Sequence, residues 1–157
     1  MSLEDLRHTL SNNYQNCLVN SCRKEGCTLK IGSLGSKDRF IIDGDKYIEH
    51  HKHTGGFCDY VVFHLSANVA VGVVEMKSGR VGASDAVRQI RSGTAFTEEL
   101  VKSIGQVKYY PVLLHGRRIH SIDLRNLRTQ KVRFQGRNYS VIVKRCGVDF
   151  KDILKEY

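Results

Sequence analysis

The feature that most constrains the fold is a continuous apolar segment in the middle of the chain, from Val69 to Met76. Five of its residues are β-branched or long apolar residues, and Gly72 is its only turn former. This composition predicts a buried central strand. The strand ends in Glu75, Met76 and Lys77. Because side chains alternate across a strand, we expect Glu75 and Lys77 on one face and Met76 on the other.

A second apolar run, Phe57 to His64, precedes this strand and carries one acid, Asp59. The short polar connection that follows predicts a hairpin. In an antiparallel pair, Asp59 at the start of the first strand comes level with the end of the second, so we expect it beside Glu75. Buried charges cost several kcal/mol unless they are compensated. A divalent cation such as Mg²⁺, which prefers carboxylate, water and phosphate oxygens, would compensate them.

An acid, a short gap and then Glu-x-Lys on the next strand resemble the signature of the PD-(D/E)xK nuclease superfamily. Asp59, Glu75 and Lys77 match this signature, and Cys58 stands where the superfamily usually has proline. The resemblance covers about Arg39 to Leu114. It implies a restriction-endonuclease-like α/β fold with an α-β-β-β-α-β core, in which helices flank a mixed central sheet. A structural salt bridge at the strand end is the alternative interpretation.

The resemblance also implies a chemistry, the Mg²⁺- or Mn²⁺-dependent hydrolysis of phosphodiester bonds. Asp59, Glu75 and the carbonyl of Met76 would hold the metal, and Lys77 would orient the nucleophile or stabilise the transition state. Similar nucleases often place a glutamine on the helix that follows. Gln89 lies in such a helix, predicted from Ser84 to Ile104 by apolar residues at alternating spacings of three and four. A surface role for Gln89 is the alternative.

The rest of the chain predicts further elements around this core. An N-terminal amphipathic helix begins after Ser2 as N-cap. A loop with at most one short strand spans Gly26 to Lys37, and a strand spans Arg39 to Ile42. The next four residues predict a turn before a histidine-rich segment that includes His50, His51 and His53. We expect these histidines on the solvated flank of a hairpin, with phosphate contact as the alternative.

The last third of the chain predicts a strand, a hairpin and a short helix. The strand is Lys108 to Leu114, in which Pro111 indicates an edge, a strand end or a bulge. The hairpin pairs residues 131–134 with residues 139–143, and the helix spans about residues 150–155.

Length and charge narrow the class of protein. The 157 residues, 41% hydrophobic and 26% charged, are typical of one globular domain, here residues 1–157. No apolar run reaches the roughly 18 residues of a membrane span, and the first ten residues lack a signal-peptide core. We therefore expect a cytoplasmic protein that does not bind membranes. The net charge of +9 favours a nucleic-acid partner.

Most of this charge comes from the last third of the chain. Between Pro111 and Phe150 there are nine lysines and arginines but only two acids. Such a concentration favours a surface that contacts the phosphate backbone, and a solubilising surface is the alternative. The residues predicted to bind nucleic acid are Arg117, Arg118, Arg125, Arg128, Lys131 and Arg133.

The five cysteines predict free thiols, because their number is odd and the chain has no signal sequence. Cys17, Cys22 and Cys27 are evenly spaced, but their gaps differ from those of zinc knuckles. A structural metal is the alternative, with Cys58 or one of the histidines as fourth ligand. Cys146 is expected simply to pack.

Together these features predict a metal-dependent endonuclease or exonuclease, with DNA as the expected substrate and RNA as the alternative. A chain of this size has little room for a specificity domain, so it is expected to act as a homodimer or with partner subunits, in antiviral defence, repair or recombination. Two other classes remain. One is a noncatalytic nucleic-acid-binding or scaffolding subunit that keeps the fold, and the other is an interaction module stabilised by metal at the cysteines.

Overall fold

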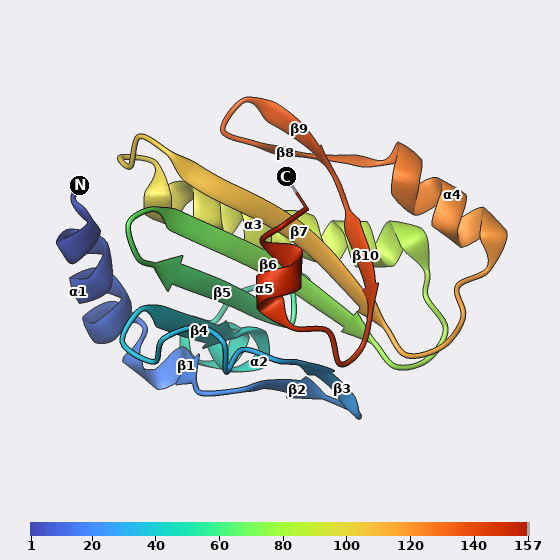
Figure 1. Ribbon diagram of the computed structural model, residues 1–157, viewed down its shortest axis with the longest axis horizontal. Coiled ribbons are helices and arrows are strands. Elements are labelled where there is room, and N and C mark those ends of the chain that lie inside the picture. The colour runs from blue at the N-terminus through green and yellow to red at the C-terminus, as the bar shows by residue number, and fades with distance from the viewer. Residues whose placement is uncertain (157) are drawn as a thin grey trace.

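A mixed six-stranded sheet forms the centre of the computed structural model, which describes residues 1–156 (Figure 1). Its strand order is β1-β4-β5-β6-β7-β10. The first four strands pair antiparallel, whereas β6, β7 and β10 run parallel. The predicted single α/β domain with a mixed sheet and flanking helices is confirmed at this level of detail.

The strands are β1 (Leu18–Val19), β2 (Cys22–Lys24), β3 (Cys27–Leu29), β4 (Arg39–Asp43), β5 (Tyr60–Leu65), β6 (Val69–Lys77), β7 (Val107–His115), β8 (Lys131–Phe134), β9 (Arg137–Ser140) and β10 (Ile142–Arg145). The helices are α1 (Leu3–Asn13), α2 (Gly44–His50), α3 (Ala83–Val101), α4 (Ser121–Thr129) and α5 (Phe150–Ile153), with a single 3₁₀ turn, η1 (Gln15–Cys17). Outside the main sheet, β2 pairs with β3 and β8 pairs with β9.

Strand β6 lies at the centre of the sheet, as its apolar sequence predicts. All of its residues except Lys77 are buried. It pairs antiparallel with β5, from Tyr60 opposite Val74 to Leu65 opposite Val69, which confirms the predicted hairpin. Gly72 provides space for the opposing layer, because a Cβ atom there would lie 2.6 Å from the ring of Phe150.

Alternation along the strands divides the core into two layers. Val61, Val71 and Val73 belong to the larger cluster, on the face that α3 covers. Val62 and Val74 belong to the other cluster, together with Phe150 of α5 and the β2–β3 hairpin. Figure 1 shows α3 behind the sheet and α5 in front of it.

Two helices agree with their sequence signals. In α1 the Ser2 hydroxyl accepts a hydrogen bond from the Asp5 N–H, and the Asp5 carboxylate accepts one from the Ser2 N–H, which forms a capping box. Helix α3 begins at Ala83 and ends at Val101, close to its predicted limits. Its buried face packs on β5, β6 and β7.

The histidine-rich segment does not flank a hairpin, so that prediction was wrong. Residues Gly44–His50 form helix α2, because the Asp43 carboxylate caps it by accepting a hydrogen bond from the Lys46 N–H at 3.1 Å. The same Asp-Gly pair that favours a turn thus begins a helix. The ring of His51 stacks on that of Tyr47, and His53 lies beside Tyr47 and Phe57.

The predicted C-terminal hairpin is present, but its second strand is divided. Residues Arg137–Ser140 pair with β8, whereas Ile142–Arg145 leave the hairpin to pair with β7. That pairing starts at Val112, directly after Pro111. The proline therefore lies in an interior strand but outside the stretch that pairs with β10. The sequence analysis missed helix α4, between β7 and β8, and α5 is shorter than predicted.

Two of the five cysteines form a disulfide, which contradicts the prediction of free thiols. Cys27 of β3 is bonded to Cys146, which follows β10, across 119 residues of sequence. The pairing depends on tertiary structure that places β3 beside the end of β10, so sequence spacing gave no sign of it. Cys17, Cys22 and Cys58 are free and buried. Among the described residues, no helix is long and apolar enough to cross a bilayer.

Candidate active site

The three residues of the predicted motif lie together where β5 begins and β6 ends. The Asp59 N–H donates to the Val74 carbonyl at 3.0 Å, which extends the β5–β6 pairing and brings Asp59 level with Glu75. By strand alternation, Asp59, Glu75 and Lys77 lie on the same face as Val61 and Val73, the face covered by α3. The predicted juxtaposition of the two acids is therefore present.

Both oxygens of Asp59 have protein partners. Its side chain is 6% exposed. Oδ2 accepts a hydrogen bond from the Met76 N–H at 2.7 Å, and Oδ1 accepts one from Lys24 Nζ at 2.5 Å. The backbone bond across the hairpin fixes the carboxylate next to the end of β6, and the lysine neutralises its charge.

Lys24 was missed by the sequence analysis. It ends β2, in the hairpin that covers the opposite layer of the core, and its ammonium lies 3.6 Å from Asp45 as well as bonding to Asp59. Partial burial by itself lowers the pKa of Lys24, but its hydrogen bond to Asp59 and the surrounding acids outweigh this, so the pKa is raised. Because Lys24 is 35 residues from Asp59 in a short strand, no local pattern pointed to it.

Glu75 has fewer compensating partners than Asp59. It is 4% exposed, and its Oε1 is buried and has no hydrogen-bond partner among the described residues. Burial, and secondarily the neighbouring Asp59 carboxylate, raises the pKa of Glu75 to about 8, although Lys77 opposes this shift. A buried oxygen without a hydrogen-bond partner is rare in proteins, and a cation or an ordered water would provide one.

Lys77 lies between two acids. Its Nζ is 3.3 Å from Glu75 Oε2 and 3.6 Å from Asp85 Oδ2 in the first turn of α3. Its side chain is 26% exposed, so one side of the ammonium can reach solvent. Asp85, which was not predicted from the sequence, thus helps to hold the Lys77 ammonium beside Glu75.

Gln89 lies in the first half of α3 and is partly buried. Its amide lies against Gly56, three residues before Asp59, so closely that a Cβ atom on Gly56 would be 2.0 Å from Gln89 Oε1. This Oε1 is the second buried oxygen without a partner in residues 1–156. Both buried side-chain oxygens that lack a hydrogen-bond partner in residues 1–156 therefore belong to residues of the predicted site.

The donor set fits a hard divalent cation. Asp59 and Glu75 offer carboxylate oxygens, and Met76, whose carbonyl is the third predicted ligand, follows Glu75 directly in the chain. No group of three His, Cys, Asp or Glu side chains in residues 1–156 is arranged to hold a metal. An ion would therefore need water or substrate oxygens too, as Mg²⁺ usually does, and it would have to compete with Lys24 for Asp59.

The predicted nucleic-acid-binding residues form two groups. Arg117 and Arg118 are exposed in the loop after β7, at the end of the sheet that carries Lys77, since Lys77 pairs with His115 and its carbonyl accepts from the Gly116 N–H. The other four are exposed on α4 and on β8, which packs against α3: Arg125, Arg128, Lys131 and Arg133. Arg91 of α3 joins them by donating to the Lys131 carbonyl.

Cys58, where the superfamily usually has proline, packs in the core. Its Sγ lies against α3, within 2.3 Å of where a Cβ on Gly93 would be. Burial, followed by the charges of Glu75 and Asp59, raises the pKa of this thiol well above its ordinary value. The thiol therefore stays protonated and serves packing.

Comparisons with protein-family models, curated proteins and solved structures find no match to this chain. The function must therefore be inferred from the geometry of the site itself.

Proposed function

We propose that this protein is a metal-dependent nuclease of the PD-(D/E)xK type, with a restriction-endonuclease-like fold, that hydrolyses phosphodiester bonds in nucleic acid, with DNA as the expected substrate and RNA as the alternative. One observation carries the proposal. Two buried carboxylates from adjacent strands meet beside a lysine, and one carboxylate oxygen has no partner in the described chain. Such an arrangement is costly unless a cation or substrate completes it.

Each residue has a role that its position supports. Asp59 and Glu75, with the Met76 carbonyl, would hold Mg²⁺ or Mn²⁺, which supplies a nucleophilic water of lowered pKa and neutralises charge on the phosphate. Lys77, held by Glu75 and Asp85, presents its ammonium to the phosphate oxygens. The free Oε1 of Gln89 can accept a hydrogen bond from an attacking water or a sugar hydroxyl.

The exposed arginines support a polyanionic substrate. Arg117 and Arg118 flank the end of β6 that carries the acids, and the second basic group extends along α4 and β8. Phosphate contacts of this kind give affinity without sequence specificity. We propose that a nucleic-acid strand follows these residues toward the acid pair.

The decisive experiment compares plasmid DNA, single-stranded DNA and RNA as substrates, each with Mg²⁺, Mn²⁺ or chelator. Glu75→Ala and Lys77→Ala should abolish metal-dependent cleavage while their circular dichroism stays that of the wild type. Lys155→Ala, which changes an exposed lysine that pairs with Asp152 on the surface of the protein, is the control and should cleave normally. Normal turnover by either site variant would refute the assignment.

A second test addresses binding. Removing charge at Arg128, Lys131 and Arg133 should weaken binding to all sequences alike and reduce the log-log salt dependence by roughly one unit per lost phosphate contact. Asp59→Ala should still bind in chelator but not cleave. Unchanged affinity and salt slope in the triple variant would place the substrate channel elsewhere.

The bond between Lys24 and Asp59 favours a second candidate, a noncatalytic nucleic-acid-binding subunit. In this structure the Lys24 ammonium neutralises Asp59, whereas in a catalytic site Asp59 would bind the metal. The same experiments separate the two functions. Binding that depends on the basic residues, without cleavage under any metal condition, would establish the noncatalytic role.

A further inference from the structure

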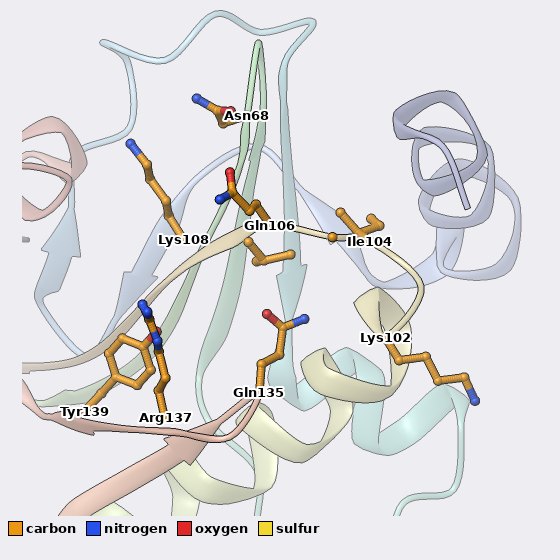
Figure 2. Close-up of a pocket in the computed structure, with 10 residues that line it drawn as sticks. Asn68, Lys102, Ile104, Gln106, Lys108, Gln135, Arg137 and Tyr139 are labelled. Carbon is orange, nitrogen blue, oxygen red and sulfur yellow. The ribbon is translucent and has the colours of Figure 1, made fainter.

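A second candidate site lies at the other end of the central strands. A hollow of about 710 Å³ is formed by Asn68, directly before β6, by the start of β7, and by the β8–β9 hairpin (Figure 2). Asn68 and Glu75 are separated by nearly the whole of β6, which corresponds to about 23 Å at about 3.3 Å per residue. The hollow is therefore distinct from the acid pair.

The topology of the C-terminal third creates this hollow. Strand β10 pairs with β7 only from Val112 onward. Along the earlier part of β7 the neighbouring segment is the β8–β9 hairpin, which pairs with itself instead of joining the sheet. A space remains between the start of β7 and the end of the hairpin, and polar side chains from both line it.

The lining is basic. It contains Lys102, Lys108 and Arg137 but no aspartate or glutamate. Glu99 pairs with Lys102 at 2.6 Å, whereas Lys108 and Arg137 form no salt bridge within residues 1–156. Figure 2 shows Lys108 and Arg137 on separate elements, β7 and the β8–β9 hairpin, among the residues that line the hollow. Two cations that line one hollow and have no acidic partner in the described chain suit a phosphate group.

The rest of the lining suits a base. Three amide side chains surround the hollow, those of Asn68, Gln106 and Gln135. Each amide carries both donors and an acceptor, as the polar edge of a nucleobase requires. Tyr139 adds a half-buried ring, held edge-on against Tyr109 at a centroid distance of 5.1 Å, on which a base can stack.

We propose that this hollow binds a nucleotide, with its phosphate between Lys108 and Arg137 and its base against Tyr139 and the amides. The volume lies within the roughly 300–1,000 Å³ of small-molecule sites. The same chemistry is offered by a free nucleotide and by one unit of a nucleic-acid strand. The proposal does not rest on cleavage at the acid pair, because no residue is shared by the two sites.

Binding to the intact chain tests the proposal, in chelator so that no metal chemistry intervenes. The probes are fluorescently labelled nucleoside monophosphates and triphosphates, a labelled single-stranded octanucleotide, and unlabelled inorganic phosphate as competitor. The variant is Lys108→Gln with Arg137→Gln. Its matched control is Lys30→Gln with Lys37→Gln, two exposed lysines between β3 and β4. We expect at least a tenfold loss of nucleotide affinity in the first variant and none in the second.

Side-chain amide resonances provide an independent readout. Nucleotide should shift the amide signals of Asn68, Gln106 and Gln135 and leave the backbone signals of Glu75 to Lys77 unchanged. Binding of mononucleotides would identify a free nucleotide as ligand, and binding of the octanucleotide alone would identify a strand. Equal loss in both double variants, displacement by phosphate as effective as by nucleotide, or unshifted amides would overturn the proposal. None of these results depends on whether the protein cleaves nucleic acid.

Discussion

At Glu75 the fold and the proposed function have opposite requirements. Burial favours a neutral carboxyl group, whereas metal binding needs a charged one. A carboxyl group on a side chain that is 5% exposed, next to a second carboxylate, is disfavoured in its charged form. Lys77 relieves only one of its oxygens, because Oε1 has no partner in the described chain. Under the proposed function, a cation bound at this site would stabilise the charged form of Glu75.

This conflict predicts a pH dependence of stability in chelator. The pKa of Glu75 rises from 4.5 to about 8 in the folded protein, so between these values the folded state binds more protons than the unfolded state. The free energy of unfolding should then fall as pH rises through this window and level off above it. Urea unfolding of wild type and Glu75→Gln at several pH values measures this, because the variant lacks that decline. Parallel curves for the two proteins would contradict the prediction.

The ion pair between Lys24 and Asp59 predicts that removing the lysine lowers stability but raises metal affinity. Lys24→Met leaves Asp59 with only its backbone partner, and should cost about 1–3 kcal/mol, less than a fully buried pair because the lysine is partly exposed. A cation would no longer compete with the ammonium for Asp59 Oδ1, so Mg²⁺ should bind the variant more tightly than the wild type. Calorimetric titration with Mg²⁺ measures this.

The control for Lys24 is Lys46→Met, which makes the same substitution at an exposed position of α2. It should change neither stability nor Mg²⁺ affinity. Weaker Mg²⁺ binding by Lys24→Met than by this control would show that Lys24 supports the metal site instead of competing with it.

At the scale of elements, α3 is positioned by close contact with the hairpin that carries the acids. A Cβ atom on Gly93 would lie 2.3 Å from Cys58 Sγ and 2.8 Å from Val73 Cγ1. Gly93→Ala should therefore destabilise the protein by about 1–3 kcal/mol through overpacking, despite the gain of about 1 kcal/mol in helix propensity.

Urea unfolding tests this contact, with Gly105→Ala as control, since a Cβ there meets no atom within 4 Å. Adding Cys58→Ala should restore part of the stability lost in Gly93→Ala, because the sulfur is then gone. A stability of Gly93→Ala equal to that of the control would show that α3 shifts freely and does not fix the site.

Local pattern accounts for the elements that the sequence predicted correctly. Apolar runs gave β5 and β6, and helical spacing gave α3, so the positions of Asp59 and Glu75 followed from strand alternation. The short elements α2 and α4 were missed because their buried faces are small: one buried residue in each, Gly44 and Leu127. Lys24 and Asp85 required tertiary contacts that no periodicity encodes.

At the scale of the whole molecule, strand β3 meets the segment that follows β10 on one side of the sheet. The Gly147 N–H donates to the Thr28 carbonyl, and the Lys30 N–H donates to the Val148 carbonyl. The disulfide between Cys27 and Cys146 joins the same segments covalently. Together these bonds hold the β2–β3 hairpin, and Lys24 with it, against the rest of the protein.

The disulfide also bears on the predicted cytoplasmic location. Disulfides persist mainly in oxidising compartments, whereas cytosolic thiols are kept reduced. Titration of the unreduced, denatured protein should find three reactive thiols, those of Cys17, Cys22 and Cys58. Five thiols would show that the bond does not form and would restore the original prediction.

The final prediction concerns what the disulfide does. A crosslink across 119 residues restricts the unfolded chain strongly, so replacing Cys27 and Cys146 by serine should lower the free energy of unfolding by about 2–4 kcal/mol. Reductant should destabilise the wild type to a similar extent but leave the double variant unchanged, which separates bond loss from the substitutions themselves. Hydrogen exchange in β2 and β3 should accelerate more than in β6, because the bond anchors that hairpin. Uniform acceleration across the sheet would show instead that the disulfide stabilises the fold as a whole, without a particular hold on the hairpin that carries Lys24.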